Sequence, residues 1–365
     1  MRIAYDHQIF SMQMYGGISR YFCEIAGRIG QFDCCKVKIF APLYVTKLAG
    51  GLTQGHLLGI RIPAIPRTIR LRQRMNAALV RILLRRDPPD VVHETYYAET
   101  TVAPKAARIV VTVHDMINEK LLHLVSPEDP TSFLKAESVR RADRIICVSE
   151  NTKKDLVEIL NVDPSRISVI YHGCSLTTSN GRKTKNSTSR KPFLLYVGLR
   201  GGYKNFQRLL QAYGSSKQLM NDFKLICFGG PPFSVPEIQS MKAFEIEDRV
   251  SQIGGDDSTL RELYTSTTCL VYPSLYEGFG IPVLEAMACE CPVACSRTSS
   301  LPEVAGDAAE YFDPTDSDSI RTAIEGVVYS DERRSNLAAH GKQRAAQFSW
   351  DRCARQTHQV YSSLI

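Results

Sequence analysis

Short apolar runs rich in β-branched residues recur along the first half of the chain, and helical or turn-rich stretches separate them. Runs of this kind are typical of buried strands. We predict strands at residues 2–6, 37–41, 91–94, 109–114, 145–149 and 168–171. Because strands that alternate with helices favour a parallel, doubly wound sheet, this half is predicted to form an α/β domain.

A polar stretch at residues 175–191, rich in Ser, Thr, Asn, Lys and Arg, interrupts this pattern. Such a composition cannot bury a core and is typical of a linker. The pattern then restarts, with strands predicted at residues 193–197, 223–228, 250–253, 269–272 and 293–295. We therefore predict two Rossmann-like domains, at residues 1–174 and 192–348, joined by a linker at 175–191.

The pattern near the carboxyl end predicts helix from about residue 331 to 365, with a break before residues 348–350. We expect Ser349 to cap the last helix and Trp350, the only tryptophan, to pack in a core. Residues 1–10 lack the apolar segment of a signal peptide, and no run approaches the ~18 apolar residues that a membrane span needs. We therefore expect a cytoplasmic protein.

The chain contains eleven cysteines, an odd number, and no paired C-x-x-C spacing occurs among them. Cys147 and Cys227 fall in apolar runs, as does Cys269, and cysteine acts there as a small hydrophobe. A later cluster has no histidine close by: Cys289, Cys291 and Cys295. We expect neither a disulfide framework nor a metal centre.

The formal net charge of +7 favours an acidic partner, such as nucleic acid, anionic lipid or a phosphorylated substrate. Eight arginines and no acidic residue lie between Arg61 and Arg86. Apolar residues at helical spacing lie among them: Ile69, Met75, Leu79, Ile82 and Leu83. Two interpretations stay open. Residues 68–86 form either an amphipathic helix on an anionic membrane or a helix that these apolar residues pack onto its own sheet.

Residues 271–292 predict a strand, a glycine-rich turn and a helix with Pro282 in its first turn. The backbone of such a turn attracts an anion, here at Gly278, Phe279, Gly280 and Ile281. Two ionised acids, Glu277 before the turn and Glu285 inside the helix, can only accept hydrogen bonds. The implied ligand carries both phosphate and hydroxyl groups, although a glutamate near a helix start can also merely compensate the helix dipole.

Two further glycine pairs precede predicted helices. Gly16 and Gly17 follow the first strand, where a strand, a turn and a helix form a concavity the size of a phosphate. Arg200 and Lys204 flank another pair after the strand at 193–197, and their side chains suit a diphosphate. Each of these turns can also be a solvated connection.

Polar residues stand at the carboxyl ends of three predicted strands of the first half, where ligands of doubly wound sheets bind. This rule selects His93 with Glu94, His114 with Asp115, and Ser149 with Glu150. A histidine at a strand end is often only structural. Both histidines are nevertheless kept as candidates, with His114 ahead of His93.

The segment EGFGIPVLE at residues 277–285, followed by Ala286, Met287 and Ala288 and by LPEV at 301–304, resembles the donor-site signature of glycosyltransferase family 4. The resemblance extends over nearly the whole chain. It implies the GT-B fold, in which two doubly wound Rossmann-like domains face each other across a cleft. It also implies that the last helix, at about 349–365, returns to the first domain, and that a sugar is transferred with retention from a nucleotide diphosphate.

By this resemblance the catalytic residues are His114, near the transferred sugar, and Glu277, on the sugar hydroxyls. The residues implied to bind the donor are Gly16, Gly17, Arg200, Lys204, Gly278, Phe279, Gly280, Ile281 and Glu285, the last of them at the ribose. No metal or other cofactor is expected, because the two cations supply positive charge and no Asp-x-Asp motif occurs.

The segments YGGISRYF at 15–22 and VGLRGGYKNF at 197–206 resemble bacterial mannosyltransferases of lipopolysaccharide and polysaccharide assembly. This resemblance implies GDP-mannose as donor and a saccharide or lipid-linked acceptor, with peripheral association at the inner face of the membrane as an option. A UDP-sugar donor, a nucleotide-sugar epimerase and a basic protein that binds RNA or glycan stay open as alternatives. Because both glutamates and both cations are present, no nucleic-acid partner is expected.

Overall fold

The structure is a computed structural model that describes residues 1–47, 56–124, 126–176 and 191–365. The described chain divides into two compact units. The first contains Met1–Leu122, Ser126–Gly173 and Ser349–Ile365, and the second contains His123–Val125 and Cys174–Phe348. The first part of this unit thus ends at Gly173, one residue before the expected boundary at 174. The unit also includes the last helix. Most of the expected linker lies outside the described residues.

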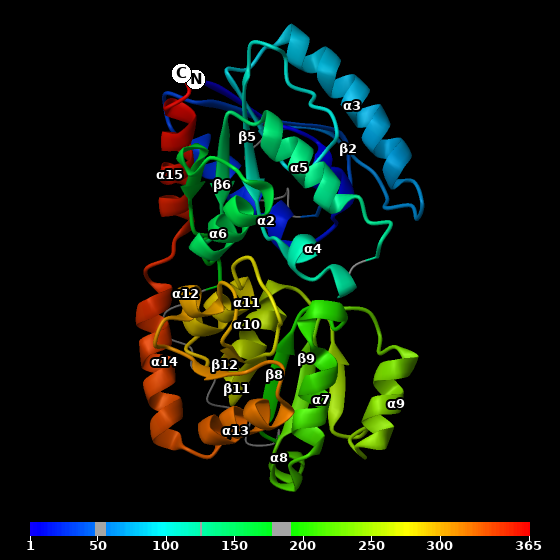
Figure 1. The fold of residues 1–365 in the computed structure, drawn as a ribbon, viewed down its shortest axis with the longest axis vertical. Coiled ribbons are helices and arrows are strands. Elements are labelled where there is room, and N and C mark those ends of the chain that lie inside the picture. The colour runs from blue at the N-terminus through cyan, green and yellow to red at the C-terminus, as the bar shows by residue number, and fades with distance from the viewer. Residues whose placement is uncertain (48–55, 125, 177–190) are drawn as a thin grey trace. The chain divides into compact units, whose positions relative to one another are not determined.

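The first unit is built on a parallel sheet of seven described strands in the order β3-β2-β1-β4-β5-β6-β7 (Figure 1). Its strands are β1 (Arg2–Tyr5), β2 (Lys36–Tyr44), β3 (Leu57–Arg61), β4 (Val91–Glu94), β5 (Arg108–Val113), β6 (Arg144–Cys147) and β7 (Ile167–Val169). Its helices are α1 (Gln8–Met12), α2 (Gly17–Ile29), α3 (Ile69–Arg86), α4 (Ile117–Lys120), α5 (Thr131–Arg141), α6 (Glu150–Leu160) and α15 (Trp350–Ser362), with 3-10 turns η2 (Leu122–Leu124) and η3 (Pro164–Arg166). All six strands predicted in this half are present, and the edge strand β3 is additional.

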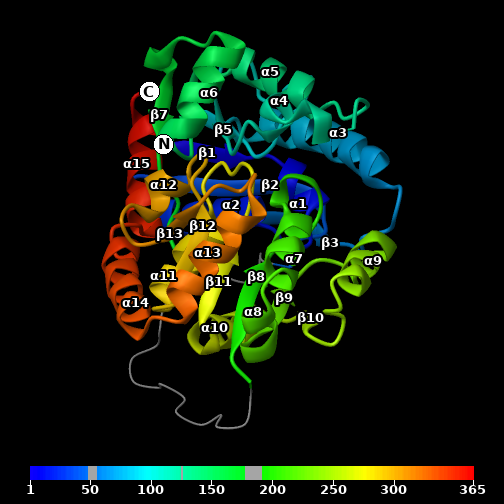
Figure 2. The ribbon, with the colours of Figure 1, turned by 60° about the horizontal axis from the view of Figure 1, so that its bottom comes forward.

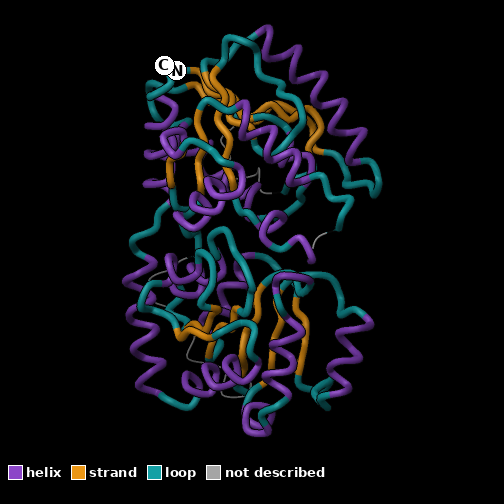
Figure 3. The backbone as a smooth tube through the Cα atoms, viewed as in Figure 1, coloured by secondary structure: helices purple, strands orange, loops and turns teal. Residues whose placement is uncertain are grey.

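Successive side chains of β1 point to opposite faces of the first sheet, and both faces are buried. Ile3 and Tyr5 pack in one cluster with α2 and α15, whereas Ala4 packs in another cluster with Val80 and Leu84 of α3. The sheet therefore lies between helices on both sides, as the orange strands between purple helices show in Figure 3.

The last helix, α15, belongs to the first unit and confirms two expectations. The Ser349 hydroxyl accepts a hydrogen bond from the backbone N–H of Arg352 at 3.2 Å, so it caps the helix. Trp350 is 3% exposed and joins the cluster of α2 and β1. A Cβ atom at Gly173 would lie 2.1 Å from the backbone nitrogen of Trp350, so only glycine fits where these segments meet.

The second unit is built on a parallel sheet of six described strands in the order β10-β9-β8-β11-β12-β13 (Figure 2). Its strands are β8 (Phe193–Val197), β9 (Lys224–Phe228), β10 (Val250–Ile253), β11 (Cys269–Tyr272), β12 (Val293–Ser296) and β13 (Glu310–Phe312). Its helices are α7 (Phe206–Gly214), α8 (Lys217–Asp222), α9 (Val235–Ala243), α10 (Asp257–Ser266), α11 (Ile281–Ala288), α12 (Leu301–Ala305), α13 (Ser317–Val328) and α14 (Asp331–Ala345), with a 3-10 turn η4 (Gly202–Lys204). The fold of two doubly wound Rossmann-like units is confirmed.

Each sheet reverses its direction of winding beside its first strand. In the first unit β1 pairs with both β2 and β4, and in the second unit β8 pairs with both β9 and β11. Ligands of such sheets bind beyond the carboxyl ends of the strands at this switch point. The loops after β1 and β4, and those after β8 and β11, are therefore where a site is expected.

In the described part of the chain, no helix combines the length and the apolar character that crossing a bilayer demands.

Candidate functional site

Lys204, Glu277 and Tyr272 form a buried polar group at the switch point of the second sheet. Lys204 ends the turn η4 after β8, Tyr272 ends β11, and Glu277 lies in the turn that follows. The Lys204 ammonium donates to Oε1 of Glu277 at 2.6 Å and to the Tyr272 hydroxyl at 3.0 Å. The Tyr272 hydroxyl donates to the same carboxylate oxygen at 2.8 Å. The structure thus brings two predicted site residues together and adds Tyr272, which sequence reasoning missed.

Lys204 and Glu277 form an ion pair with little contact to water, since their side chains are 14% and 10% exposed. Burial lowers the pKa of Lys204, but the negative charge of Glu277, with Tyr272 and Tyr203, outweighs burial and holds that pKa well above its ordinary value. Lys204 is therefore charged at neutral pH. The pair holds a cation ready for a phosphate and a carboxylate ready for a hydroxyl.

The backbone around Glu277 is held by side chains from neighbouring turns. The N–H of Glu277 donates to the Ser299 hydroxyl at 2.9 Å, and the Ser300 hydroxyl donates to the Glu277 carbonyl at 2.9 Å. The Asn205 amide, just after Lys204, donates to the carbonyl of Pro273 at 3.0 Å. These contacts fix the turns after β8 and β11 relative to each other.

The glycine-rich turn after Glu277 leads into α11 through a glycine that no other residue can replace without strain. Gly280 has a φ of 98°, and a Cβ atom there would lie 2.6 Å from Cδ2 of Leu301. The Phe279 ring is 4% exposed and packs edge-on against Phe348 at 5.9 Å. Any ligand contact from Phe279 therefore comes from its backbone, as is expected of Gly278, Gly280 and Ile281 at this helix start.

Glu285 lies inside α11 and is 7% exposed. Its carboxylate accepts a hydrogen bond from the Tyr264 hydroxyl at 3.2 Å. Burial, with a smaller effect of the Glu285 charge, holds the pKa of Tyr264 well above its ordinary value, so this tyrosine is a neutral donor. The expected contact of Glu285 with a ribose stays a prediction.

Arg200, the other predicted cation, points toward α9. Its Nε donates to Glu237 at 2.9 Å, its Nη1 donates to the carbonyl of Gly229 at 3.1 Å, and its Nη2 donates to the carbonyl of Pro231. The guanidinium also lies 4.7 Å from the centre of the Phe233 ring, and the side chain is only 2% exposed. These contacts hold the turn after β9, and the expected contact of Arg200 with a diphosphate stays a prediction.

In the first unit His114 directly follows β5 and is 9% exposed. Its ring packs edge-on against Tyr21 at 5.4 Å and is stacked on His172 at 6.1 Å. Burial, with the nearby His172, His93 and Lys135, keeps the pKa of His114 well below its ordinary value. His114 is therefore neutral, and its Nε2 atom has no hydrogen-bond partner among the described residues.

His93, the weaker candidate, lies inside β4 and faces the core. Its ring is fully buried, with Nδ1 2.6 Å from the Tyr361 hydroxyl and Nε2 2.9 Å from the Thr112 hydroxyl. Burial lowers its pKa to about 3. The expectation that His93 faces a ligand is therefore wrong. Ser149 is also structural, since its hydroxyl caps α6 by accepting from the N–H of Thr152 at 3.0 Å.

Gly16 and Gly17 stand at the start of α2, as expected. The Gly16 carbonyl accepts from the N–H of Arg20 at 3.1 Å, and a Cβ atom at Gly16 would lie 2.2 Å from Oε1 of Gln13. Tyr21, which packs against His114, is in the first turns of the same helix. The start of α2 and His114 therefore belong to one region of the first unit.

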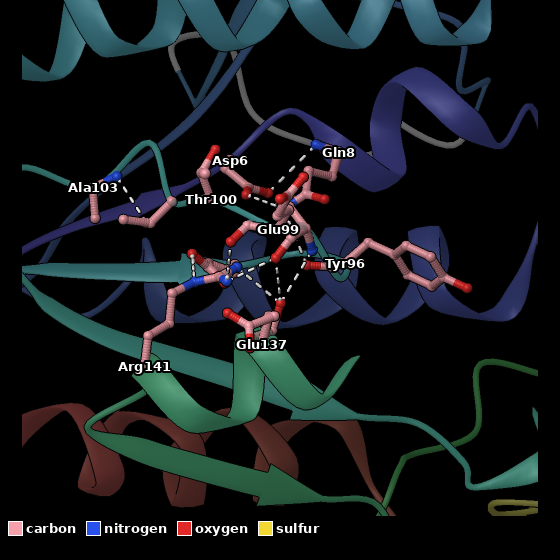
Figure 4. Close-up of polar contacts among 12 residues, drawn as sticks. Asp6, Gln8, Tyr96, Glu99, Thr100, Ala103, Glu137 and Arg141 are labelled. Atoms are coloured by element: carbon pink, nitrogen blue, oxygen red, sulfur yellow. Dashed lines mark hydrogen bonds and ion pairs between the residues drawn. The ribbon is translucent and has the colours of Figure 1, made fainter. Parts of the chain in front are cut away.

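A second buried network holds the loops at the switch point of the first sheet (Figure 4). Asp6, directly after β1, accepts hydrogen bonds from the backbone N–H of Thr95 at 2.9 Å and from the Gln8 amide at 2.8 Å. Arg141 of α5 donates to both carboxylate oxygens of Glu94, at 3.1 and 2.7 Å. Asp6 and Glu94 are 2% and 1% exposed, so these contacts are structural supports for the loop after β4.

One group of side chains among the described residues has the spacing of metal ligands, and it lies outside both switch points: Cys34, Cys35 and His358. The cysteines that follow α11 are buried and form no such group in the described chain: Cys289, Cys291 and Cys295.

Two family models together match nearly the whole sequence. Residues 15–178 match Glycosyltransferase Family 4, and residues 178–344 match Glycosyl transferases group 1. The chain is 33% identical over 270 residues to O-antigen chain mannosyltransferase B of Escherichia coli, and the matched region covers 70% of this chain and 71% of that protein. It is 32% identical over 197 residues to O-antigen chain mannosyltransferase RfbU of Salmonella typhimurium, and this matched region covers 53% of this chain and 54% of that protein.

Among solved structures, a sucrose-phosphate synthase from Thermosynechococcus elongatus has a similar fold. Its TM-score is 0.80 at 19% identity, over 100% of this chain and 98% of that one. Identity this low supports the fold alone, whereas the E. coli relative and the two family models support the family. The chain belongs to glycosyltransferase family 4, has the GT-B fold and is a glycosyltransferase.

Proposed function

We propose that the chain transfers mannose from GDP-mannose, with retention at the anomeric carbon, to a hydroxyl of a saccharide or lipid-linked saccharide in surface polysaccharide assembly. The observation that carries this proposal is the buried contact of Lys204 with Glu277 at the switch point of the second sheet. Relatives named as O-antigen mannosyltransferases support mannose as the sugar.

The reaction needs stabilisation of the departing diphosphate and of the positive charge that grows on the sugar ring. On donor binding, the Lys204 ammonium exchanges the Glu277 carboxylate for a phosphate oxygen, and backbone N–H groups near Gly280 bind the same diphosphate. Glu277, released from the lysine, accepts hydrogen bonds from the sugar hydroxyls. Preorganised charges of this kind act strongly in a site from which water is excluded.

The acceptor attacks from the face that the leaving group occupies, and the departing phosphate takes the proton of the acceptor hydroxyl. We propose no metal for this step, because Lys204 and the helix start of α11 supply the positive potential. His114 of the first unit, neutral and with Nε2 available, would form a hydrogen bond with the transferred sugar.

The donor nucleotide can be identified by isothermal titration calorimetry. We expect GDP to bind at least about tenfold more tightly than UDP, because a site that hydrogen-bonds one base leaves its polar groups unpaired with another. EDTA should leave the affinity for GDP unchanged. Tighter binding of UDP would replace GDP-mannose by a UDP-sugar, and binding of neither nucleotide would contradict the assignment of the donor site.

Helix α3 presents three different faces, and their residues bear on the two interpretations of the arginine-rich segment. One stripe is buried against its own unit: Arg72, Asn76, Val80 and Leu84. A second stripe is apolar and between 43% and 62% exposed: Leu71, Met75, Leu79 and Ile82. A third stripe, at the same helical spacing, is basic: Arg70, Arg74, Arg81 and Arg85.

The interpretation that the apolar residues pack α3 onto its own sheet is therefore wrong for all but one of them. Ile69, Met75, Leu79 and Ile82 are exposed, and only Leu83 packs against the cluster with Val80 and Leu84. Helix α3 packs against β2 (Figure 1). An exposed apolar stripe next to a row of arginines is the arrangement that binds an anionic membrane surface. We propose this surface as the partner of α3.

Liposome flotation tests this proposal. We expect the wild type to float with vesicles that contain anionic lipid and to remain unbound with neutral vesicles or at high salt. Each neutralised arginine near the surface should cost about fivefold in partition, at about 1 kcal/mol per basic residue. Arg70→Gln combined with Arg74→Gln should therefore reduce binding more than tenfold. Arg352→Gln combined with Arg355→Gln, at two exposed arginines on α15, is the matched control, and equal loss in both double variants would refute a role specific to α3.

A further inference from the structure

Two adjacent cysteines and a histidine distant in sequence come together in the first unit, away from the residues assigned to the donor. Cys34 and Cys35 lie between α2 and β2, and His358 lies on α15. Sγ of Cys34 is 3.7 Å from Sγ of Cys35 and 3.6 Å from Nε2 of His358. All three potential ligand atoms lie within 4.8 Å of one another.

The two separations that involve Cys34 fit one tetrahedral ion. With Zn–S bonds of about 2.3 Å and a Zn–N bond of about 2.0–2.1 Å, tetrahedral angles place two sulfurs about 3.8 Å apart and a sulfur and a nitrogen about 3.5–3.6 Å apart. The observed separations of 3.7 Å and 3.6 Å agree with both values. Thiolate and imidazole are also the ligands that zinc prefers over the hard oxygen ligands of magnesium or calcium.

The surroundings favour access from solvent and a fixed imidazole. Cys34 is exposed, Cys35 is buried and His358 is partly buried. The Phe32 ring packs edge-on against the His358 ring at 5.2 Å, and the N–H of Cys35 donates to the Phe32 carbonyl at 2.8 Å. One residue thus contacts both the histidine and the cysteine loop, so the ligands are held near each other before an ion arrives.

We propose that Cys34, Cys35 and His358 bind one zinc ion, with a water molecule as the fourth ligand. The ion would connect α15 to the loop before β2, two segments that are remote in the sequence. Its role is to stabilise the attachment of the last helix to the first unit, because an ion that binds only the folded arrangement adds its binding free energy to folding. This site is independent of the proposed transfer reaction.

Zinc titration of the full chain, reduced beforehand and stripped with EDTA, tests the site against a competing chromophoric chelator. We expect one tightly bound zinc per chain. Changing a residue that only supports a ligand typically costs 10–100-fold in metal affinity, so Cys34→Ser and His358→Ala should each cost more than about 100-fold. Cys23→Ser, at a cysteine of α2 outside the group, should bind zinc like the wild type. Substituting Co²⁺ should give thiolate-to-cobalt charge-transfer absorption that Cys34→Ser reduces.

A second readout is thermal unfolding followed by the fluorescence of Trp350 at the start of α15. Zinc should raise the melting temperature of the wild type and of Cys23→Ser but not that of His358→Ala. Cys34 is exposed, so its serine variant keeps the fold and remains informative even if His358→Ala is unstable. Three results would overturn the proposal: no stoichiometric zinc in the wild type, zinc binding that both ligand variants retain, or a Cys34–Cys35 disulfide that persists in reductant.

Discussion

The Lys204→Met variant is expected to turn over its sugar-nucleotide donor about 10²–10³-fold more slowly than the wild type, by analogy with the loss of one preorganised donor from an oxyanion site. Among the residues that the structure describes, Lys204 is the cation that contacts the Glu277 carboxylate, at 2.6 Å. Glu277→Gln should cause a loss of similar size, because the carboxylate is needed to bind the sugar hydroxyls. Donor consumption at saturating donor measures both effects.

The double variant separates function from stability. Lys204→Met alone leaves the Glu277 carboxylate buried without its ammonium partner, whereas Lys204→Met with Glu277→Gln removes both charges and should fold better than either single variant. Because the two groups touch, the double loss in rate should be smaller than the product of the single losses. Lys242→Met changes a lysine of the same unit whose side chain is 64% exposed and should leave turnover unchanged. Wild-type rates in all the Lys204 and Glu277 variants would refute the assignment.

Arg141→Leu is expected to destabilise the first unit by about 3–5 kcal/mol, the cost of leaving one member of a buried ion pair without its partner. Arg141 donates to both oxygens of Glu94, whose side chain is only 1% exposed. Urea denaturation followed by tryptophan fluorescence measures the effect on this unit alone, because Trp350 is the only tryptophan and belongs to it. Arg140→Leu, next in the sequence but 74% exposed, should cost less than about 1 kcal/mol.

The loss in Arg141→Leu should grow as the pH rises. Burial raises the pKa of Glu94 above its ordinary value even though Arg141 lowers it, so removing Arg141 raises that pKa further. Between the unfolded and the folded pKa the folded state then binds a proton that the unfolded chain has released, and the free energy of unfolding falls as pH increases. The variant should therefore be closer to wild type at pH 5 than at pH 7. Arg141→Leu with Glu94→Leu should regain most of the stability, and a double variant no better than the single one would contradict a charge-based cause.

Most of the fold could be predicted because parallel strands buried on both faces are continuous apolar runs. The strands that were not predicted are edge strands whose apolar runs are short or interrupted. In β3, Gly59 interrupts the run, and four of its five residues are exposed. The glycine is needed because a Cβ atom there would lie 1.8 Å from the carbonyl oxygen of Ala41. The other edge strand, β13, has only three residues.

The site was predictable where it depends on position after a strand, and less so where it depends on which partner a side chain finds. His114 follows the last residue of β5, whereas His93 lies inside β4, one residue before its end, and is fully buried. Both are close to a strand end in the sequence, and both rings pack against Phe22 on the same side of the sheet. They differ because both ring nitrogens of His93 find hydroxyl partners inside the core.

Arg200 shows the same limit for long-range contacts. The sequence indicates a basic turn after β8, but it does not indicate that Glu237 would lie beside it. Glu237 accepts from the backbone N–H of Ser234 at 2.6 Å as part of the cap of α9, and it pairs with Arg200 at 2.9 Å. Tyr272 was missed for a related reason, since a tyrosine at the end of an apolar strand is usually counted as core. Its hydroxyl becomes part of the site only because Lys204 and Glu277 meet there.

The central claim is that Lys204 binds the diphosphate of the donor while Glu277 binds its sugar. The most direct measurement compares the dissociation constants of GDP and of guanosine, which lacks phosphates, for the wild type and for Lys204→Met. If Lys204 contacts the diphosphate, the variant should bind GDP about tenfold or more weakly, the value of a charge-assisted hydrogen bond, and should bind guanosine as the wild type does. Unchanged affinity for GDP, or an equal loss for both ligands, would contradict the claim.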